Sequence, residues 1–236
     1  MTNQTKGPGA LRNKNQTLLC DMRRLWRHHG LGCVIGVLFL VTFGFGQILS
    51  GWRSYNERRS ENSEAPVTLR QYMRSAHFVE ATAENWESEF FQMFVYVYIT
   101  SFLFQRGSAE SNDPDKPRPK RAVTAQSPWP VRRGGLWRAL YGRSLSLAFA
   151  LLFFASFAAH CLSSAQLENE ERARHGLGAL GVFEYIAGAQ FWFESFQNWQ
   201  SEFLAIGAMV WLSIFLREKN SPESKDLEAP HRETGK

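Results

Sequence analysis

The sequence predicts an all-α integral membrane protein, a four-helix bundle built from two parallel helical-hairpin repeats with external amphipathic helices. Three observations predict this fold class: long charge-free segments, a repeat at a fixed offset, and lysine and arginine concentrated on one side. The mean hydropathy of −0.30 and the 21% of charged residues resemble those of a soluble domain. Because charged and apolar residues are segregated along the chain, these averages conceal the membrane segments.

The two longest apolar segments, residues 30–52 and 144–165, contain no charged residue. At about 1.5 Å of rise per residue, a helix of either length crosses a hydrocarbon core of roughly 30 Å. We therefore predict a membrane helix in each segment. A secretory signal peptide is the alternative for the first, but the segment is too long and no small-residue cleavage site follows it.

Two shorter apolar runs, residues 90–104 and 203–216, are too brief to cross a bilayer alone. Each follows a polar stretch rich in aromatic residues, and the joined segments form helices of about 26 residues with an amphipathic first half. We predict that both helices return across the membrane. In the external segment before each of them, a short amphipathic helix is expected, the first beginning at a capping box formed by Thr68 and Gln71.

A gapless repeat at an offset of 113 residues relates the two halves of the chain. Residues 85–90, NWESEF, match residues 198–203, NWQSEF, and Tyr72 corresponds to Tyr185. Since each repeat holds two membrane helices, both begin on the same side of the membrane and the repeats are parallel. The predicted organisation is a basic arm (1–28), repeat 1 (29–105), a Pro/Arg-rich linker (106–143), repeat 2 (144–217) and a polar tail (218–236).

The distribution of positive charge orients the bundle. Of the 27 lysine and arginine residues, 20 lie in the two ends of the chain and the central linker, and 7 lie in the two other loops. Cytoplasmic loops carry the excess of these residues in membrane proteins. We therefore expect both termini and the linker to be cytoplasmic.

Polar side chains are predicted to share one face at the start of each returning helix, where they would point into the bundle. They are Glu84, Asn85, Ser88, Glu89, Gln92, Glu194, Gln197, Asn198, Ser201 and Glu202. The pseudo-twofold axis could place Glu89 near Glu202, and paired carboxylates suit a proton or cation pathway. The alternative is a hydrogen-bonded network that sets the register of the helices.

Candidate metal ligands occur on the first returning helix, where His77, Glu80 and Glu84 stand at i, i+3 and i+7. The second repeat has no such set, so the duplication gives a metal site no support, and we predict none. His160, alone in its apolar segment, is interpreted as a satisfied polar residue. We find no Ser-His-Asp arrangement, phosphate loop or dinucleotide fingerprint, and therefore predict no enzymatic activity and no cofactor.

The expected partners are lipids and other membrane helices. The linker presents four arginines beside two tryptophans, a composition suited to anionic lipid headgroups at the cytoplasmic face. These arginines are Arg132, Arg133, Arg138 and Arg143. Interleaved aromatic and basic residues also occur in nucleic-acid sites, but basic clusters next to membranes are common, and we predict no nucleic acid. Gly32 and Gly36 permit close helix approach, which suits a homodimer or a membrane-protein partner.

Several motifs resemble a bacterial family of hypothetical transmembrane proteins that carry a domain of unknown function. They are HGLG, QxLxGWRSYNE, FQRGSAES, SPWPVRRGG, FWFESFQNWQSEF and SIFLREKNSPESK. The resemblance implies a multi-pass protein of the bacterial cytoplasmic (inner) membrane and supplies no catalytic residues. We expect a non-enzymatic protein that acts through helix packing or partner binding. The alternative is an ion- or proton-conducting protein that uses Glu89 and Glu202.

Overall fold

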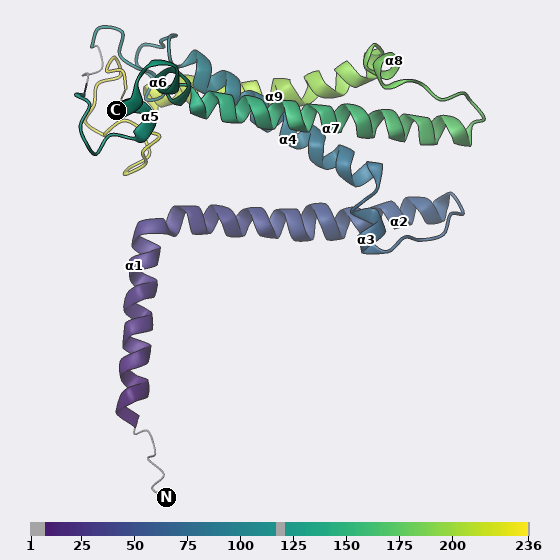
Figure 1. Ribbon diagram of the computed structural model, residues 1–236, viewed down its shortest axis with the longest axis horizontal. Helices are drawn as coiled ribbons and strands as arrows, with labels where there is room; N and C mark the ends of the chain where they lie inside the picture. The colour runs from purple at the N-terminus through teal and green to yellow at the C-terminus, as the bar shows by residue number, and fades with distance from the viewer. Residues whose placement is uncertain (1–7, 117–120, 236) are drawn as a thin grey trace, which may run out of the picture. The chain divides into compact units, whose positions relative to one another are not determined.

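The structure is a computed structural model that describes residues 8–116 and 121–235. Within these residues it contains nine α-helices, one π-helix and no strand (Figure 1), so the all-α prediction is confirmed. The chain forms two compact units, Met1–Met73 and Arg74–Lys236. The boundary between the units lies inside the range 29–105 predicted for repeat 1.

The first unit is a nearly continuous helix followed by one short helix. It consists of α1 (Pro8–Val41), the π-helix η1 (Thr42–Ser50), α2 (Gly51–Glu61) and α3 (Leu69–Tyr72). Side-chain hydroxyls bond to backbone carbonyls at both ends of η1. Thr42 Oγ1 donates to the carbonyl of Leu38 at 2.9 Å, and Ser50 Oγ donates to the carbonyl of Phe45 at 2.9 Å. Thr68 and Gln71 form the predicted capping box at the start of α3.

Tyr72 anchors α3 against α2 within the first unit. Its side chain is buried, and burial raises the pKa of Tyr72 above its usual range, which keeps the hydroxyl neutral. A Cβ atom at residue 51 would overlap the Tyr72 hydroxyl, so Gly51 provides the space for this contact. The loop between the two helices is held by Trp52, whose indole Nε1 donates to the carbonyl of Val67 at 2.8 Å.

The second unit contains three long helices and three short ones. They are α4 (Ala76–Ile99), α5 (Trp129–Arg133), α6 (Gly135–Tyr141), α7 (Ser144–Arg174), α8 (Val182–Ile186) and α9 (Ala189–Phe215). α4 packs along both α7 and α9 (Figure 1). A core of Cys161, Ala165, Tyr185 and Phe191 joins α7, α8 and α9, and the Phe191 side chain is completely buried.

Hydrogen bonds recur at an offset of 113 residues. The Asn56 side chain bonds both the amide and the carbonyl of Val67, and the Asn169 side chain makes the same two bonds with Leu180. The amide of Gln105 donates to Ser111 Oγ, as that of Glu218 does to Ser224 Oγ. Arg59 donates to the carbonyl of Ala65, and Arg172 donates to the corresponding carbonyl of Gly178. Likewise, Ser88 donates to the carbonyl of Asn85, and Ser201 donates to that of Asn198.

The carboxyl-terminal segment folds back onto the loop that follows α4. The Lys225 ammonium is buried and donates to the carbonyls of Gly107, Pro230, His231 and Glu233 at distances from 2.6 to 3.3 Å. Gly107 has a φ of 85°, and a Cβ atom there would overlap the carbonyl of His231. The backbone at residue 107 therefore approaches the tail closely enough to require glycine.

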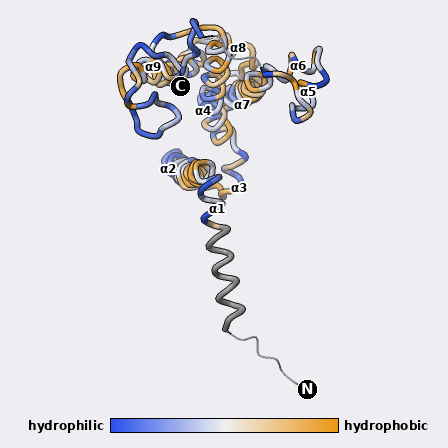
Figure 2. The backbone as a smooth tube through the Cα atoms, turned by 90° about the vertical axis from the view of Figure 1, so that its left-hand side faces the viewer, coloured by the Kyte–Doolittle hydropathy of each residue, from blue (hydrophilic) through white to orange (hydrophobic). Residues whose placement is uncertain are grey.

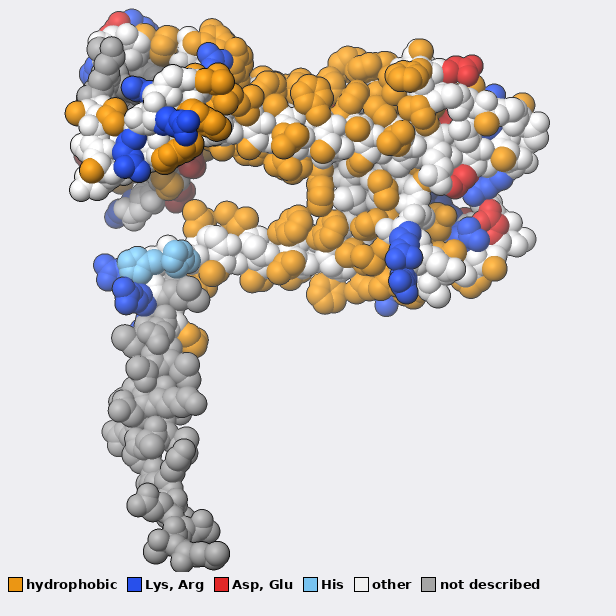
Figure 3. Space-filling view, in the orientation of Figure 1, with side chains coloured by type: hydrophobic (Ala, Val, Ile, Leu, Met, Phe, Trp, Pro, Cys, Tyr) orange, Lys and Arg blue, Asp and Glu red, His pale blue; other side chains and the backbone are white. Residues whose placement is uncertain are grey.

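Two helices are long and apolar enough to cross a membrane, spanning Trp26–Glu61 and Ser144–Arg174. They contain the two longest predicted membrane segments. α4 and α9 do not reach the same apolarity over 18 residues. Figure 2 shows hydrophobic residues along much of the long helices of the second unit and hydrophilic residues in the loops near the carboxyl terminus. In Figure 3, hydrophobic side chains cover the middle of α7, and charged side chains collect toward its ends.

Candidate functional site

A buried carboxylate–imidazole pair joins α4 to α7. Glu87 Oε2 and His160 Nδ1 lie 2.6 Å apart, and the side chains of the two residues are 1% and 0% exposed. The other carboxylate oxygen, Glu87 Oε1, accepts a hydrogen bond from Trp199 Nε1 of α9 at 3.0 Å. Glu87 therefore connects all three long helices of the second unit.

Two more carboxylates lie on the same face of α4. Glu80, Glu84 and Glu87 stand at i, i+4 and i+7, the spacing of one helical stripe. Glu84 Oε1 accepts a hydrogen bond from Asn198 Nδ2 at 2.6 Å, so neighbouring residues of α9, Asn198 and Trp199, bond to neighbouring carboxylates of α4.

One ring nitrogen of His160 is left without a partner. His160 Nε2 is buried and has no hydrogen-bond partner. Ligand atoms of Glu80, Glu84 and His160 all lie within 4.8 Å of one another. The imidazole contacts Glu87 and also packs against the ring of Phe191, with the two ring centroids 5.0 Å apart. We call Glu80, Glu84, Glu87 and His160 the α4–α7 centre.

Acidic side chains outnumber basic ones at the α4–α7 centre. Glu194 of α9 is close enough to both Glu80 and Glu84 to interact with them electrostatically. In the described part of the chain, no lysine or arginine forms an ion pair with Glu80, Glu84 or Glu194. At a separation near 5 Å and an effective dielectric constant of about 20, two carboxylates repel each other by on the order of 3 kcal/mol. The arrangement therefore favours a bound cation.

The predicted polar stripes divide between buried and exposed positions. On α4, Ser88 and Gln92 are buried and Glu84 is half-buried, whereas Asn85 and Glu89 are exposed. On α9, Glu194, Asn198 and Glu202 are half-buried, whereas Gln197 and Ser201 are exposed. Gln92 Nε2 donates to the carbonyl of Glu202 at 2.8 Å, which joins the two stripes directly.

Glu89 and Glu202 lie near each other but outside the α4–α7 centre. Glu89 acts electrostatically on Glu202. Asn85 and Ser201 bond to carbonyls of their own helices, to Ala81 at 2.7 Å and to Asn198 at 2.8 Å. These two side chains therefore contribute no bond between helices.

The candidate ligand set His77, Glu80 and Glu84 is not the one that the structure brings together. Glu80 and Glu84 belong to the cluster, but its histidine is His160 and not His77. His77 shares the helical face of Glu80, one turn earlier along α4, whereas packing of α7 against α4 brings His160 to the carboxylates. The interpretation of His160 as a satisfied polar residue holds for Nδ1, which contacts Glu87, but not for Nε2, which has no hydrogen-bond partner.

Glu87 is the functional residue that the sequence reasoning missed. The signal that could have found it is the spacing of Glu80, Glu84 and Glu87, three carboxylates on one face in a segment that must pack. Attention to the NWxSEF repeat favoured Glu89 instead, because Glu89 corresponds to Glu202 whereas Glu87 corresponds to Gln200.

The four arginines predicted to contact lipid headgroups lie on α5, on α6 and just before α7, and all are exposed. The Arg133 guanidinium lies over the rings of Trp129 and Trp137, at 5.3 and 5.6 Å from their centroids. Arg143 lies 5.9 Å from the ring centroid of Tyr98 on α4. Arg132 and Arg138 are exposed on α5 and α6.

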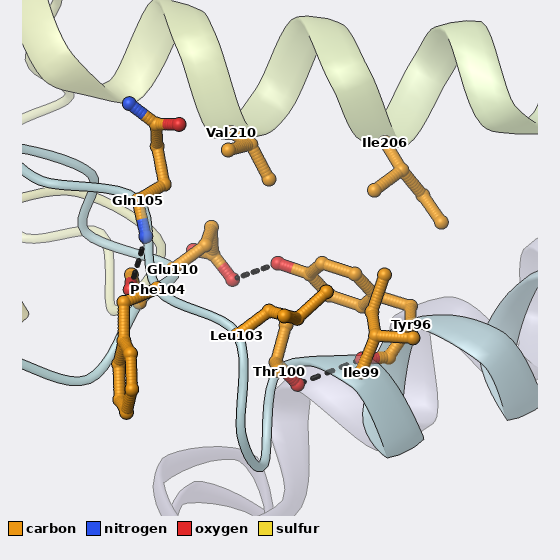
Figure 4. A pocket seen from close by; sticks show the side chains of 10 residues that line it. Tyr96, Ile99, Thr100, Leu103, Phe104, Gln105, Glu110, Ile206 and Val210 are labelled. Carbon is orange, nitrogen blue, oxygen red and sulfur yellow. Dashed lines mark hydrogen bonds between the residues drawn. The ribbon is translucent and has the colours of Figure 1, made fainter.

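A separate apolar cavity of about 150 Å³ lies near the carboxyl-terminal end of α4 (Figure 4). Among the hydrogen bonds of its lining residues is the one from the Tyr96 hydroxyl to Glu110 Oε2, 2.9 Å long. Ile206 and Val210 of α9 line the opposite side. The cavity shares no residue with the α4–α7 centre.

Comparisons with known proteins identify one family. A family profile described as a domain of unknown function, DUF6766, matches residues 22–236. Searches of curated proteins and of solved structures each found no match. Since the profile covers nearly the whole chain, both units included, the protein belongs to the DUF6766 family.

Proposed function

We propose that this protein is a non-enzymatic, multi-pass protein of the bacterial cytoplasmic membrane that binds a cation between its helices. The observation that carries the proposal is the α4–α7 centre, in which the carboxylates of Glu80, Glu84 and Glu87 lie around one imidazole and, among the described residues, no lysine or arginine forms an ion pair with them. Ionisable groups inside membrane bundles commonly mark ion pathways or binding sites.

Membrane placement is supported by the two long apolar helices and by the one-sided distribution of lysine and arginine. Exposed apolar side chains are frequent on all the long helices, among them Leu151 on α7 and Leu204 on α9, which are 71% and 74% exposed. A water-soluble protein seldom exposes a continuous apolar surface of this kind. In the proposed topology, α4 and α9 complete a four-helix bundle, with both termini cytoplasmic.

An origin by duplication is supported by hydrogen bonds that recur at the offset of 113 residues, above all the two bonds that Asn56 and Asn169 each make. The bundle would then consist of two parallel repeats. The α4–α7 centre is present once, because Phe193, Gln197 and Gln200 stand where Glu80, Glu84 and Glu87 stand. The proposed cation site therefore belongs to the first returning helix alone.

Labelling of single cysteines in cells tests the topology. In a variant whose Cys20, Cys33 and Cys161 are replaced by serine, a cysteine at Ser63 should react with a membrane-impermeant maleimide. A cysteine at Ser127, in the cytoplasmic linker, should react only after the cells are permeabilised. Equal labelling of both positions in intact cells would contradict the proposed orientation.

Equilibrium dialysis of the purified full chain tests cation binding. After treatment with a chelator, the protein is dialysed separately against Na⁺, Mg²⁺, Ca²⁺, Mn²⁺ and Zn²⁺, and bound ions are measured by elemental analysis. We expect at least one of these cations to be retained, and the double variant Glu80→Gln, Glu84→Gln to lose it. Retention of none by the wild type would reject the proposed function.

A second candidate site is the pair Glu89 and Glu202, whose carboxylates interact electrostatically. The matched double variant Glu89→Gln, Glu202→Gln separates the two possibilities. Loss of cation binding in this variant, with binding intact in the Glu80→Gln, Glu84→Gln variant, would move the function to the second pair.

A further inference from the structure

We infer that Glu80, Glu84 and His160 form a binding site for a divalent first-row transition metal, and that Glu87 is the positioning residue that orients His160. This inference rests on the proposed cation binding and names the ligand class of the same centre. It requires a nitrogen ligand with a free lone pair, oxygen ligands within reach of it, and a partner that holds the imidazole.

The nitrogen ligand is His160 Nε2. Both oxygens of Glu87 lie near donors, Oε2 beside His160 Nδ1 and Oε1 beside Trp199 Nε1. An ionised carboxylate can only accept, so Nδ1 carries the proton and the lone pair of the neutral ring is on Nε2. That atom is buried and has no hydrogen-bond partner. A buried lone pair beside carboxylates is unfavourable unless a positive group lies between them.

The oxygen ligands come from one face of α4. Glu80 and Glu84 are one turn apart, and their ligand atoms and that of His160 lie within 4.8 Å of one another. A metal with bonds of about 2.0–2.2 Å to nitrogen and oxygen holds its ligands roughly 3–4.5 Å apart. Small side-chain rotations therefore suffice to close the site. Three protein ligands leave a position for water or for the nearby Glu194 carboxylate.

The donor set selects the class of metal. Imidazole together with carboxylates suits Mn²⁺, Fe²⁺, Co²⁺ and Zn²⁺, whereas Ca²⁺ and Mg²⁺ prefer ligands that are all oxygen. No described cysteine belongs to the cluster, so a thiolate site for a softer metal is not formed. Charge also fits, since a divalent ion would offset the two carboxylates of Glu80 and Glu84.

Glu87 orients the histidine ligand by contacting its other ring nitrogen. Histidines that bind metals commonly donate their other N–H to a carboxylate, which fixes the tautomer and the ring orientation. The 2.6 Å contact between Glu87 Oε2 and His160 Nδ1 is this interaction. Because Glu87 does not itself reach the metal, its replacement should weaken binding without removing a ligand.

Cobalt provides a test with a spectroscopic readout. The purified full chain is stripped with a chelator and titrated with Co²⁺, which is followed by its visible absorption, and separately with Zn²⁺, followed by elemental analysis. We expect about one metal ion per chain, because the corresponding positions of the second repeat carry no ligands. The variant His160→Ala should lose the absorption, and Glu87→Gln should weaken binding about 10- to 100-fold.

A matched control lies at the carboxyl-terminal end of α7, where His175 is the residue that follows the helix. His175 Nε2 contacts Glu171 Oε1 at 3.0 Å, and both side chains are exposed. His175→Ala should therefore leave the stoichiometry and absorption unchanged. Circular dichroism of each variant guards against misfolding. If His160→Ala does not fold, Glu80→Gln alone, which removes one ligand and keeps the Glu87–His160 pair, provides the test.

The outcomes separate this inference from the proposed function. Retention of Ca²⁺ or Na⁺ with no binding of Co²⁺ or Zn²⁺, unaffected by His160→Ala, would overturn the transition-metal site and leave cation binding intact. Binding of no cation would overturn both. Cobalt binding that His160→Ala and Glu80→Gln leave unchanged would place the metal at the surface and reject the site.

Discussion

Glu87 and His160, 73 residues apart in the chain, form a buried contact of 2.6 Å between α4 and α7. Both residues are almost fully removed from solvent, and each has a further contact: Glu87 accepts from Trp199, and a ring nitrogen of His160 lies within 4.8 Å of a carboxylate oxygen of both Glu80 and Glu84. The pair thus sets the geometry of the α4–α7 centre and the packing of α4, α7 and α9 together.

Removal of the Glu87 carboxylate should destabilise the second unit strongly. Glu87→Ala leaves two buried donors, His160 Nδ1 and Trp199 Nε1, without their acceptor, and breaking a buried pair in this way costs about 3–5 kcal/mol. Thermal unfolding in detergent, followed by circular dichroism, measures the loss. Glu89→Ala, at an exposed position two residues further along α4, should change the unfolding temperature little. Equal effects of the two substitutions would contradict the assigned role of Glu87.

A methyl group at residue 51 should disrupt the packing of α3 on α2. In Gly51→Ala the new Cβ overlaps the buried Tyr72 hydroxyl, and overpacking of this kind costs about 1–3 kcal/mol. The double variant with Tyr72→Phe removes the overlapping oxygen and should recover most of the stability. Unfolding of both variants, measured by the same method, gives the interaction energy between residues 51 and 72. Additive losses would show that the two positions do not meet.

Replacement of Lys225 should release the carboxyl-terminal tail. Lys225→Met keeps the length of the side chain but removes the donor to the four carbonyls of residues 107, 230, 231 and 233. Limited proteolysis should then cleave the tail several-fold faster than in the wild type, because its attachment to the loop after α4 is weakened. Lys219→Met, at an exposed position, is the control. Unchanged cleavage in Lys225→Met would show that the tail is held by other contacts.

Asn56 and Asn169 should make equivalent contributions to their two loops. Asn56→Ala removes both hydrogen bonds to Val67, and Asn169→Ala removes both to Leu180. Each loss is on the order of 1–2 kcal/mol of local stability, and amide hydrogen exchange should quicken around the partner residue alone. An effect in only one of the two loops would argue against equivalent repeats.

The sequence alone was sufficient for the helical class of the fold and for its two most apolar helices. Charge-free segments that are long enough to span a bilayer have few other stable conformations, so residues 30–52 and 144–165 could be assigned without tertiary information. The capping box at Thr68 was likewise predictable, because Thr68 and Gln71 interact within one turn. These features depend on neighbours that are close in the chain.

The composition of the α4–α7 centre depended on the tertiary structure. Helical periodicity shows which residues share a face of α4, but not which face meets α7, and the repeat directed attention to Glu89 rather than to Glu87. The pairing of Glu87 with His160, and the proximity of the His160 imidazole to Glu80 and Glu84, follow from the packing of α4 against α7. Local sequence determines helices through contacts within a few residues, whereas a site shared by two helices depends on their relative rotation and register, which only packing decides.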